Sequence, residues 1–153
     1  MCYAFHDGRD LDEMISFAKK AADRGTEYGN QIGAPSVSAR LELVRQYRKD
    51  HELTEALDFI ADIIGTGLPV EESAVAAIAF ACISEGDPGL CAEYAVNGGG
   101  DTDTVAAMAC GICGALRGEE AFDDEVIKRL EKVNGLSFDE MAEKMMAARN
   151  WRQ

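Results

Sequence analysis

Two aspartates one residue apart, Asp101 and Asp103, are the side chains of this sequence with the clearest capacity for chemistry. They follow a run of three glycines, residues 98–100, and Thr104 comes directly after them. In an extended segment, residues i and i+2 point the same way, so we expect both carboxylates to converge on one point. Carboxylate and hydroxyl oxygens suit Mg²⁺, with Mn²⁺ or Ca²⁺ as alternatives, and not zinc. The spacing therefore predicts a metal site formed by Asp101, Asp103 and Thr104.

The same residues also fit a plain helix start. Asp and Thr are ordinary N-cap residues, and a bare Asp-x-Asp-Thr is more often a cap than a metal site. The three glycines let the chain turn sharply, and the dipole of a following helix partly offsets two negative charges. The sequence around the motif, described below, favours the metal site over the cap.

Helical periodicity runs through most of the chain, and with only three prolines it indicates an all-α protein. No alternating strand pattern, linker or internal repeat is present, so we expect a single unit over residues 1–153 with seven or eight helices. Capping residues, prolines and glycines set the expected limits. The expected helices cover about 10–25, 35–47, 53–64, 71–84, 88–97, 103–116, 123–135 and 137–146.

Apolar patterns predict which helices are buried. The Ala-rich helix at 71–84 is apolar nearly all round, so we expect it at the centre. The helix at 103–116 is rich in small residues, which allows neighbouring helices to approach closely. Later in the chain two further apolar sets are expected to face inward: Val126, Ile127, Leu130 and Val133, and then Met141, Met145 and Met146.

Composition excludes several classes of protein. The chain has 153 residues, 47% of them hydrophobic, and a net charge of -13, as in an acidic globular domain. Such a surface repels phosphate backbones, so we expect no nucleic-acid partner. No apolar run is long enough to span a bilayer, and the N-terminal residues lack the order of a secretion signal.

Five cysteines, an odd number, argue against a secreted disulfide scaffold and for a reducing cytoplasm. We expect four of them to act as small apolar core residues. The Cys110-Gly111-Ile112-Cys113 stretch has the spacing of a redox or zinc motif, but no second such pair follows, so buried packing is the favoured interpretation. The four are Cys82, Cys91, Cys110 and Cys113.

The stretch Ala95–Met108, centred on Gly98-Gly99-Gly100-Asp101-Thr102-Asp103-Thr104, resembles the second metal motif of the ADP-ribosylglycohydrolase family. Segments 65–77 and 111–118 also resemble that family, and the match is best over 65–118. Its members are compact all-α bundles that bind two Mg²⁺ ions and hydrolyse the glycosidic bond of ADP-ribose attached to a protein side chain or a related acceptor. The resemblance implies that Asp101, Asp103 and Thr104 are metal ligands, that Thr102 points elsewhere, and that Gly99 and Gly100 lie beside the substrate.

Other family elements are missing from this sequence. The first metal motif, a threonine followed by paired aspartates, is absent, as are the N-terminal glutamate and the glycine-rich segments of the ADP-ribose cleft. We therefore expect the C-terminal half of a family domain, inactive alone, with no assignable catalytic residue. Such a half is expected to self-associate or to pair with a polypeptide that supplies the N-terminal half. The alternatives are a non-catalytic, partner-binding helical module or remnant and, less favoured, a thiol-redox or zinc protein.

Overall fold

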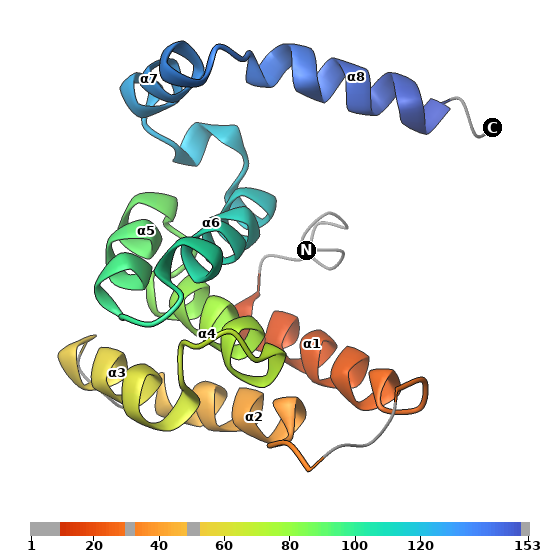
Figure 1. Ribbon diagram of the computed structural model, residues 1–153, viewed down its shortest axis with the longest axis vertical. Helices are drawn as coiled ribbons and strands as arrows, with labels where there is room; N and C mark the ends of the chain where they lie inside the picture. The colour runs from red at the N-terminus through yellow and green to blue at the C-terminus, as the bar shows by residue number, and fades with distance from the viewer. Residues whose placement is uncertain (1–9, 30–32, 49–52, 151–153) are drawn as a thin grey trace. The chain divides into compact units, whose positions relative to one another are not determined.

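The computed structural model describes residues 10–29, 33–48 and 53–150, and throughout these residues the regular structure is helical, without strands (Figure 1). The expectation of an all-α fold is confirmed. The chain divides into two compact units, Met1–Ala121 and Phe122–Gln153. Within the described ranges no helix has the length and apolar character that crossing a bilayer requires.

The first unit contains six α-helices and two short helical turns within its described residues. A π-helical turn, Ile60–Ile64, continues α3, and a single turn of 3-10 helix, Glu119–Ala121, follows α6. The α-helices are α1 (Leu11–Gly25), α2 (Val37–Tyr47), α3 (Leu53–Phe59), α4 (Val70–Ile83), α5 (Pro88–Asn97) and α6 (Thr102–Arg117).

Among the described residues of this unit, three helices begin with a side-chain cap. In each, the oxygen of the cap residue accepts the backbone N–H three positions further on, which satisfies one of the free N–H groups of the first turn. The pairs are Asp10 with Glu13, Ser36 with Ala39, and Asp87 with Leu90.

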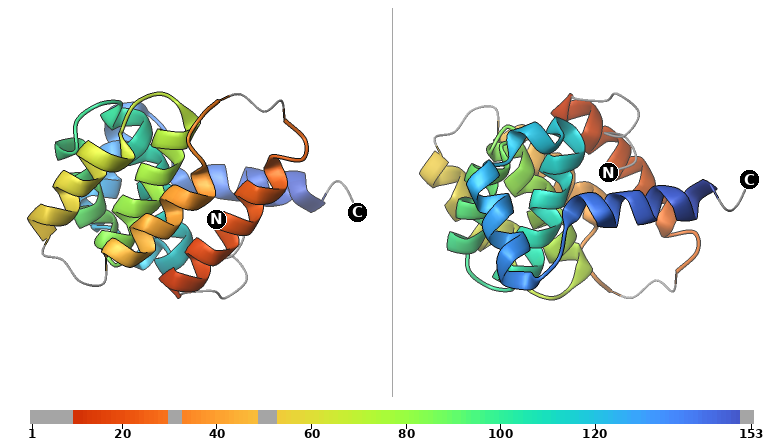
Figure 2. Two further views of the ribbon diagram at one scale, coloured as in Figure 1. Left: turned by 90° about the horizontal axis from the view of Figure 1, so that it is seen from below. Right: turned by 90° about the horizontal axis from the view of Figure 1, so that it is seen from above.

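Helix α4 lies at the centre of the first unit, as its apolar sequence predicts. It packs against α2, α5, α6 and the π-helical turn. In Figure 1 it lies between α2 on one side and α5 and α6 on the other, and Figure 2 shows the same helices from below and above. Phe80 of α4 is completely buried, and α6 adds Val105, Ala109, Cys113 and Leu116 to the same core. The start of α6 therefore rests on a packed support.

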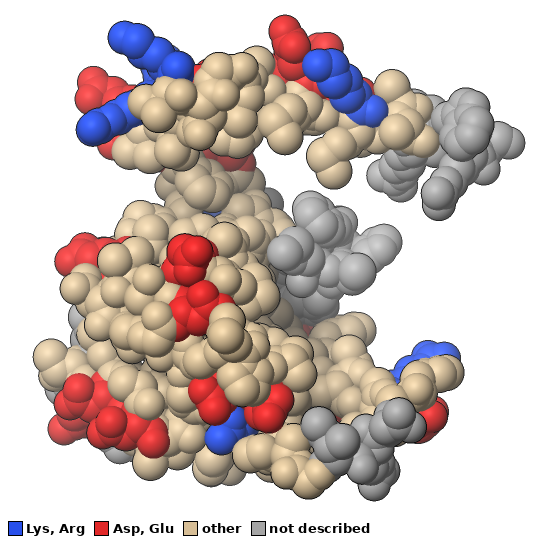
Figure 3. Space-filling view, in the orientation of Figure 1, with Lys and Arg blue, Asp and Glu red and all other residues tan. Residues whose placement is uncertain are grey.

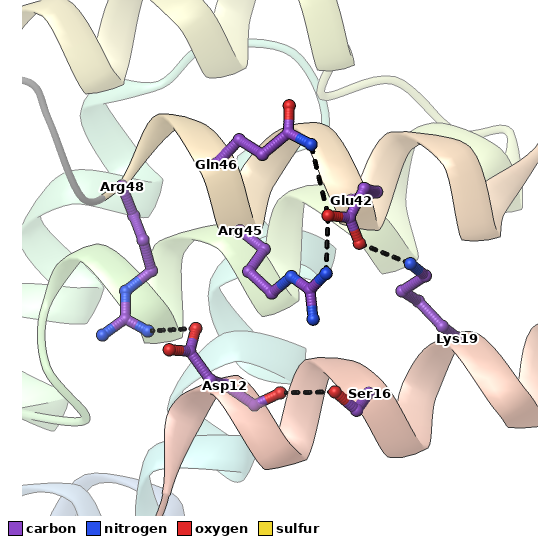
Figure 4. A network of polar contacts seen from close by, with 7 residues as sticks. All are labelled: Asp12, Ser16, Lys19, Glu42, Arg45, Gln46 and Arg48. Carbon is purple, nitrogen blue, oxygen red and sulfur yellow. Dashed lines mark hydrogen bonds and ion pairs between the residues drawn. The ribbon is translucent and has the colours of Figure 1, made fainter.

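A polar network joins α1 to α2 (Figure 4). The Glu42 carboxylate of α2 accepts hydrogen bonds from Lys19 of α1 and, at 2.6 Å, from Arg45. These contacts, that with Lys19 foremost, lower the pKa of Glu42 from 4.5 to about 2. Near the start of α1 and the end of α2, Nη1 of Arg48 lies 3.5 Å from Oδ1 of Asp12. The two helices are thus held by charge as well as by their apolar faces.

The second unit consists of α7 (Asp124–Asn134) and α8 (Phe138–Asn150). Asp123 caps α7 by accepting the N–H of Glu125 at 2.7 Å, and Gly135 ends it in the left-handed conformation, with φ 64°. At the start of α8, Ser137 accepts the N–H of Glu140 at 3.3 Å. The ends of these helices agree with the capping residues that the sequence predicts.

Taken by itself, the second unit does not show the burial that the sequence predicts. Helix α7 has no buried residue: Val126, Leu130 and Val133 are exposed and Ile127 is half-buried. The methionines of α8 expected in the core are exposed as well. Periodicity identifies the apolar side of a helix, but it does not show that another element covers that side. The exposed α8 residues are Met141, Met145 and Met146.

Candidate metal site

The connection from α5 to α6 carries the predicted motif. Gly98 is the C-cap of α5, and Asp101 occupies the N-cap position of α6. Between them Gly99 and Gly100 have φ values of 73° and 69°. Side chains with a Cβ rarely adopt this left-handed region, so the two glycines allow a turn that other residues would strain.

Gly100 also lies against a second segment of the chain. A Cβ atom at Gly100 would lie 2.3 Å from Oγ1 of Thr66 and 2.5 Å from its carbonyl oxygen. That carbonyl accepts the N–H of Asp101 at 2.8 Å, and Thr66 is itself buried. At Gly99, by contrast, a Cβ would meet no atom within 4 Å. Glycine is therefore required at Gly100 by close packing as well as by conformation.

Two side chains of α4, Phe80 and Glu72, support the glycine turn and the loop that contains Thr66. A Cβ on Gly98 would lie 2.5 Å from Cζ of Phe80, so the turn rests on a buried ring. Oε2 of Glu72 accepts the N–H of Gly67 at 2.9 Å. The loop before α4 and the loop before α6 are thus both anchored on α4.

Helix capping does not account for the Asp101 carboxylate. Asp101 stands at the N-cap position, yet its side chain accepts no capping hydrogen bond, unlike that of Asp87 on α5. Among the described residues, neither Asp101 nor Asp103 makes a side-chain hydrogen bond or an ion pair. Asp101 is half-buried, whereas Asp103 and Thr104 are exposed. The oxygens of all three remain available to a ligand from solvent.

The expected extended geometry is wrong at this site. Helix α6 begins at Thr102, so Asp103 and Thr104 lie in its first turn. Helical residues two positions apart point in different directions, so the period-two argument for converging carboxylates does not apply there. Over the described ranges, no group of three or more His, Cys, Asp or Glu side chains is placed to hold a metal ion. The donors that the motif itself offers are two carboxylates and a hydroxyl, a set that fits a hard cation retaining several waters.

Comparison with known proteins identifies the family. A family model described as ADP-ribosylglycohydrolase matches residues 1–153. This chain belongs to the ADP-ribosylglycohydrolase family. The uncharacterized protein YegU of Escherichia coli (strain K12) is 38% identical over 148 residues, which are 96% of this chain and 44% of YegU. The chain thus spans less than half the length of that curated relative. No solved structure matches.

Family membership confirms the resemblance that the motif indicated. The helical architecture agrees with an ADP-ribosylglycohydrolase fold. Sequence reasoning did not identify the supports of the glycine turn, which are Thr66, Glu72 and Phe80. The first two lie within a segment that resembles the family, but nothing in their spacing reveals that they hold residues 65–67 and 98–101.

Proposed function

We propose that this chain supplies the second metal-binding segment of an ADP-ribosylglycohydrolase. The assembled protein would hydrolyse, with Mg²⁺, the glycosidic bond of ADP-ribose joined to a protein side chain or a related acceptor. Mn²⁺ and Ca²⁺ are the alternative cations. The observation that carries the proposal is the Asp101 carboxylate, which occupies a capping position without capping, beside the exposed Asp103 and Thr104.

Each residue of the motif has a distinct part in this proposal. Asp101, Asp103 and Thr104 supply oxygen ligands, and the bound cation would orient ribose hydroxyls and polarise the bond to be cut. Gly99 has open space where a side chain would be, which leaves room for a substrate beside the turn. Gly100 keeps the turn against Thr66 and so keeps the ligands at the start of α6.

The charge of the chain explains why a cation is needed. Its net charge is -13, and in Figure 3 the face of the first unit carries several acidic groups and few basic ones. A pyrophosphate would be repelled by this surface unless a bound cation inverted the local field. Metal binding and recognition of ADP-ribose are therefore linked in this proposal.

The site needs further groups to be complete. The motif offers about three protein oxygens, while Mg²⁺ takes roughly six ligands, and the motif contains no evident general acid or base. We propose that a second polypeptide or a second copy of the chain supplies the missing groups. The exposed apolar residues Leu68 and Val70, before and within α4, support such an association.

Reconstitution tests the proposal. The purified chain would be combined with the portion of YegU that it does not match, and release of ADP-ribose from a modified peptide would be followed chromatographically. We expect release only from the combination, only with a divalent cation, and not with Asp103→Ala. Asp87→Asn, which alters a carboxylate that caps α5, is the matched control and should remain active.

Two outcomes would contradict parts of this proposal. Release by the chain alone, lost in Asp103→Ala, would show that no other polypeptide is needed and that copies of this chain supply every group. A stable complex without release under any condition would contradict the hydrolase. It would favour instead the non-catalytic, partner-binding module.

A further inference from the structure

Large apolar side chains are exposed close to the contact that joins the two loops of the candidate metal site. The carbonyl oxygen of Thr66 accepts the N–H of Asp101 at 2.8 Å, and its hydroxyl lies 3.5 Å from the carbonyl oxygen of Gly98. Within four positions of Thr66 or Gly98 along the chain, four aliphatic side chains are more than half exposed, although burial would stabilise each of them. We call this group the apolar rim, and its exposed fractions are Ile63 55%, Leu68 81%, Val70 66% and Val96 59%.

The rim differs from the other exposed apolar residues of the first unit. In the part of that unit that the structure describes, the others come from separate places on α1, α2 and α5 and from the turn after α1. Lys20 also lies over the ring of Phe17, 5.6 Å from its centroid. Single exposed apolar residues are common on soluble proteins, whereas a group around one structural feature indicates an interaction surface. The other residues are Phe17, Tyr28, Leu43 and Leu90.

The segments that carry the rim and the motif are strongly acidic. Residues 62–72 and 93–104 contain six carboxylate side chains and no lysine or arginine. Arg40 of α2 places one positive charge beside them, because its guanidinium donates to the carbonyl oxygen of Glu71 at 2.8 Å. A partner that covers the rim should therefore carry lysine or arginine side chains around an apolar patch, since like charges facing each other oppose association. The six carboxylates belong to Asp62, Glu71, Glu72, Glu93, Asp101 and Asp103.

This charge makes a second copy of the chain a poor partner for the rim. A two-fold pair sets the same patch of both subunits face to face, so the carboxylates of one copy would oppose those of the other. The comparison offers a more suitable partner, because the 148 matched residues are only 44% of YegU. More than half of that relative lies outside the match, and a polypeptide of this kind could cover the rim beside a motif that still needs further ligands.

We propose that the apolar rim is the docking surface for a polypeptide equivalent to the part of YegU outside the match, and that this polypeptide presents an apolar patch flanked by lysine or arginine. The inference rests on the proposed function, because it takes the motif as one part of a divided site. Docking at the rim removes its side chains from water and brings the partner's groups beside Asp101 and Asp103. The rim therefore joins the two parts of the site as well as the two polypeptides.

Co-expression tests this assignment with the full chain. The chain would carry an affinity tag, and the portion of YegU outside the matched 148 residues would be produced in the same cells. A chelator is present during purification, so that recovery does not depend on a bound cation. We expect the two polypeptides to be recovered together in equal amounts. Leu68→Lys and Val96→Lys should each lower the recovery of the YegU portion at least about tenfold, whereas Leu43→Lys on α2, the matched control, should leave it unchanged.

Several results would overturn the docking surface. One is the absence of a complex, and another is equal recovery with all three variants. Light scattering that shows a dimer of the chain alone, lost in Leu68→Lys, would assign the rim to a second copy. A fall in the thermal stability of the chain alone in Leu68→Lys, absent in Leu43→Lys, would show that the chain covers the rim itself.

Failure of the docking surface can be told apart from failure of the proposed function. A complex that is lost in Leu68→Lys, but that releases no ADP-ribose with any cation, would support the docking surface and contradict the hydrolase. Release that requires the YegU portion but is unchanged in Leu68→Lys and Val96→Lys would support the hydrolase and overturn the docking surface.

Discussion

The backbone N–H of Asp101 donates a 2.8 Å hydrogen bond to the carbonyl oxygen of Thr66. This bond ties the start of α6 to the loop before α4, across 35 positions of sequence, and Gly100 lies directly in the contact. The candidate ligand Asp101 is therefore positioned by Thr66, a residue of another loop. Disturbing the contact should alter both stability and cation binding.

Gly100→Ala tests this contact, with Gly99→Ala as its matched control. Both residues have positive φ, so either alanine should lower the free energy of unfolding by about 1 to 2 kcal/mol. At Gly100 the new Cβ also meets Thr66, which should add about 1 to 3 kcal/mol and weaken cation binding. Urea unfolding and calorimetry would measure the two effects. Equal destabilisation by both variants would show that the contact with Thr66 is unimportant.

Glu72 should act as a support of the loop rather than as a charge. Its carboxylate accepts the N–H of Gly67 at 2.9 Å, and glutamine keeps an oxygen at that position. We expect Glu72→Ala to lower the free energy of unfolding by about 1 to 2 kcal/mol and Glu72→Gln to lower it less. Thermal and urea unfolding would compare them. A larger loss in Glu72→Gln than in Glu72→Ala would contradict this assignment.

Glu42 should make stability depend on acidity. Its pKa is lowered from 4.5 to about 2 in the folded chain, chiefly by Lys19, so the folded state favours the ionised form. The stabilisation is therefore present above pH 4.5 and is lost as the pH falls toward 2. Glu42→Gln should unfold more easily than the unaltered chain at neutral pH, and the difference should disappear over that range.

Urea unfolding at a series of pH values would measure this dependence. Glu140→Gln is a suitable control, because Glu140 faces Lys144 in an exposed pair that should contribute little. A constant difference between Glu42→Gln and the unaltered chain from pH 7 to pH 2 would contradict the proposed network.

Much of the helical order can be predicted from local signals. Asp87 before Pro88 marks the start of α5, and Gly135 marks the end of α7, because capping and left-handed glycine act over a few residues. The π-helical turn Ile60–Ile64 cannot be predicted in this way, since its apolar spacing also suits an ordinary helix. The apolar side of α7 can be identified from its spacing, but its own unit does not cover that side, and periodicity does not indicate which element would.

The candidate site likewise has parts that the sequence reveals and parts that it does not. The motif and its family are recognisable because Asp101, Asp103 and the glycines are contiguous. The role of Thr66 is not recognisable, because it depends on a contact between loops far apart in the chain. The sequence predicts an extended segment at Asp101–Asp103, but helix α6 begins at Thr102. The helix therefore starts one residue nearer to the glycines than its apolar periodicity indicates.

Calorimetric titration with Mg²⁺ and with Mn²⁺ tests the central claim most directly. The comparison sets the unaltered chain beside Asp101→Asn/Asp103→Asn and beside Asp87→Asn, in which a capping residue that is not a proposed ligand is changed. We expect weak, saturable binding by the unaltered chain and by Asp87→Asn, and binding at least about tenfold weaker in the double variant, because each lost carboxylate removes a charged oxygen ligand. Equal binding by all three proteins would contradict the assignment of Asp101 and Asp103 as metal ligands.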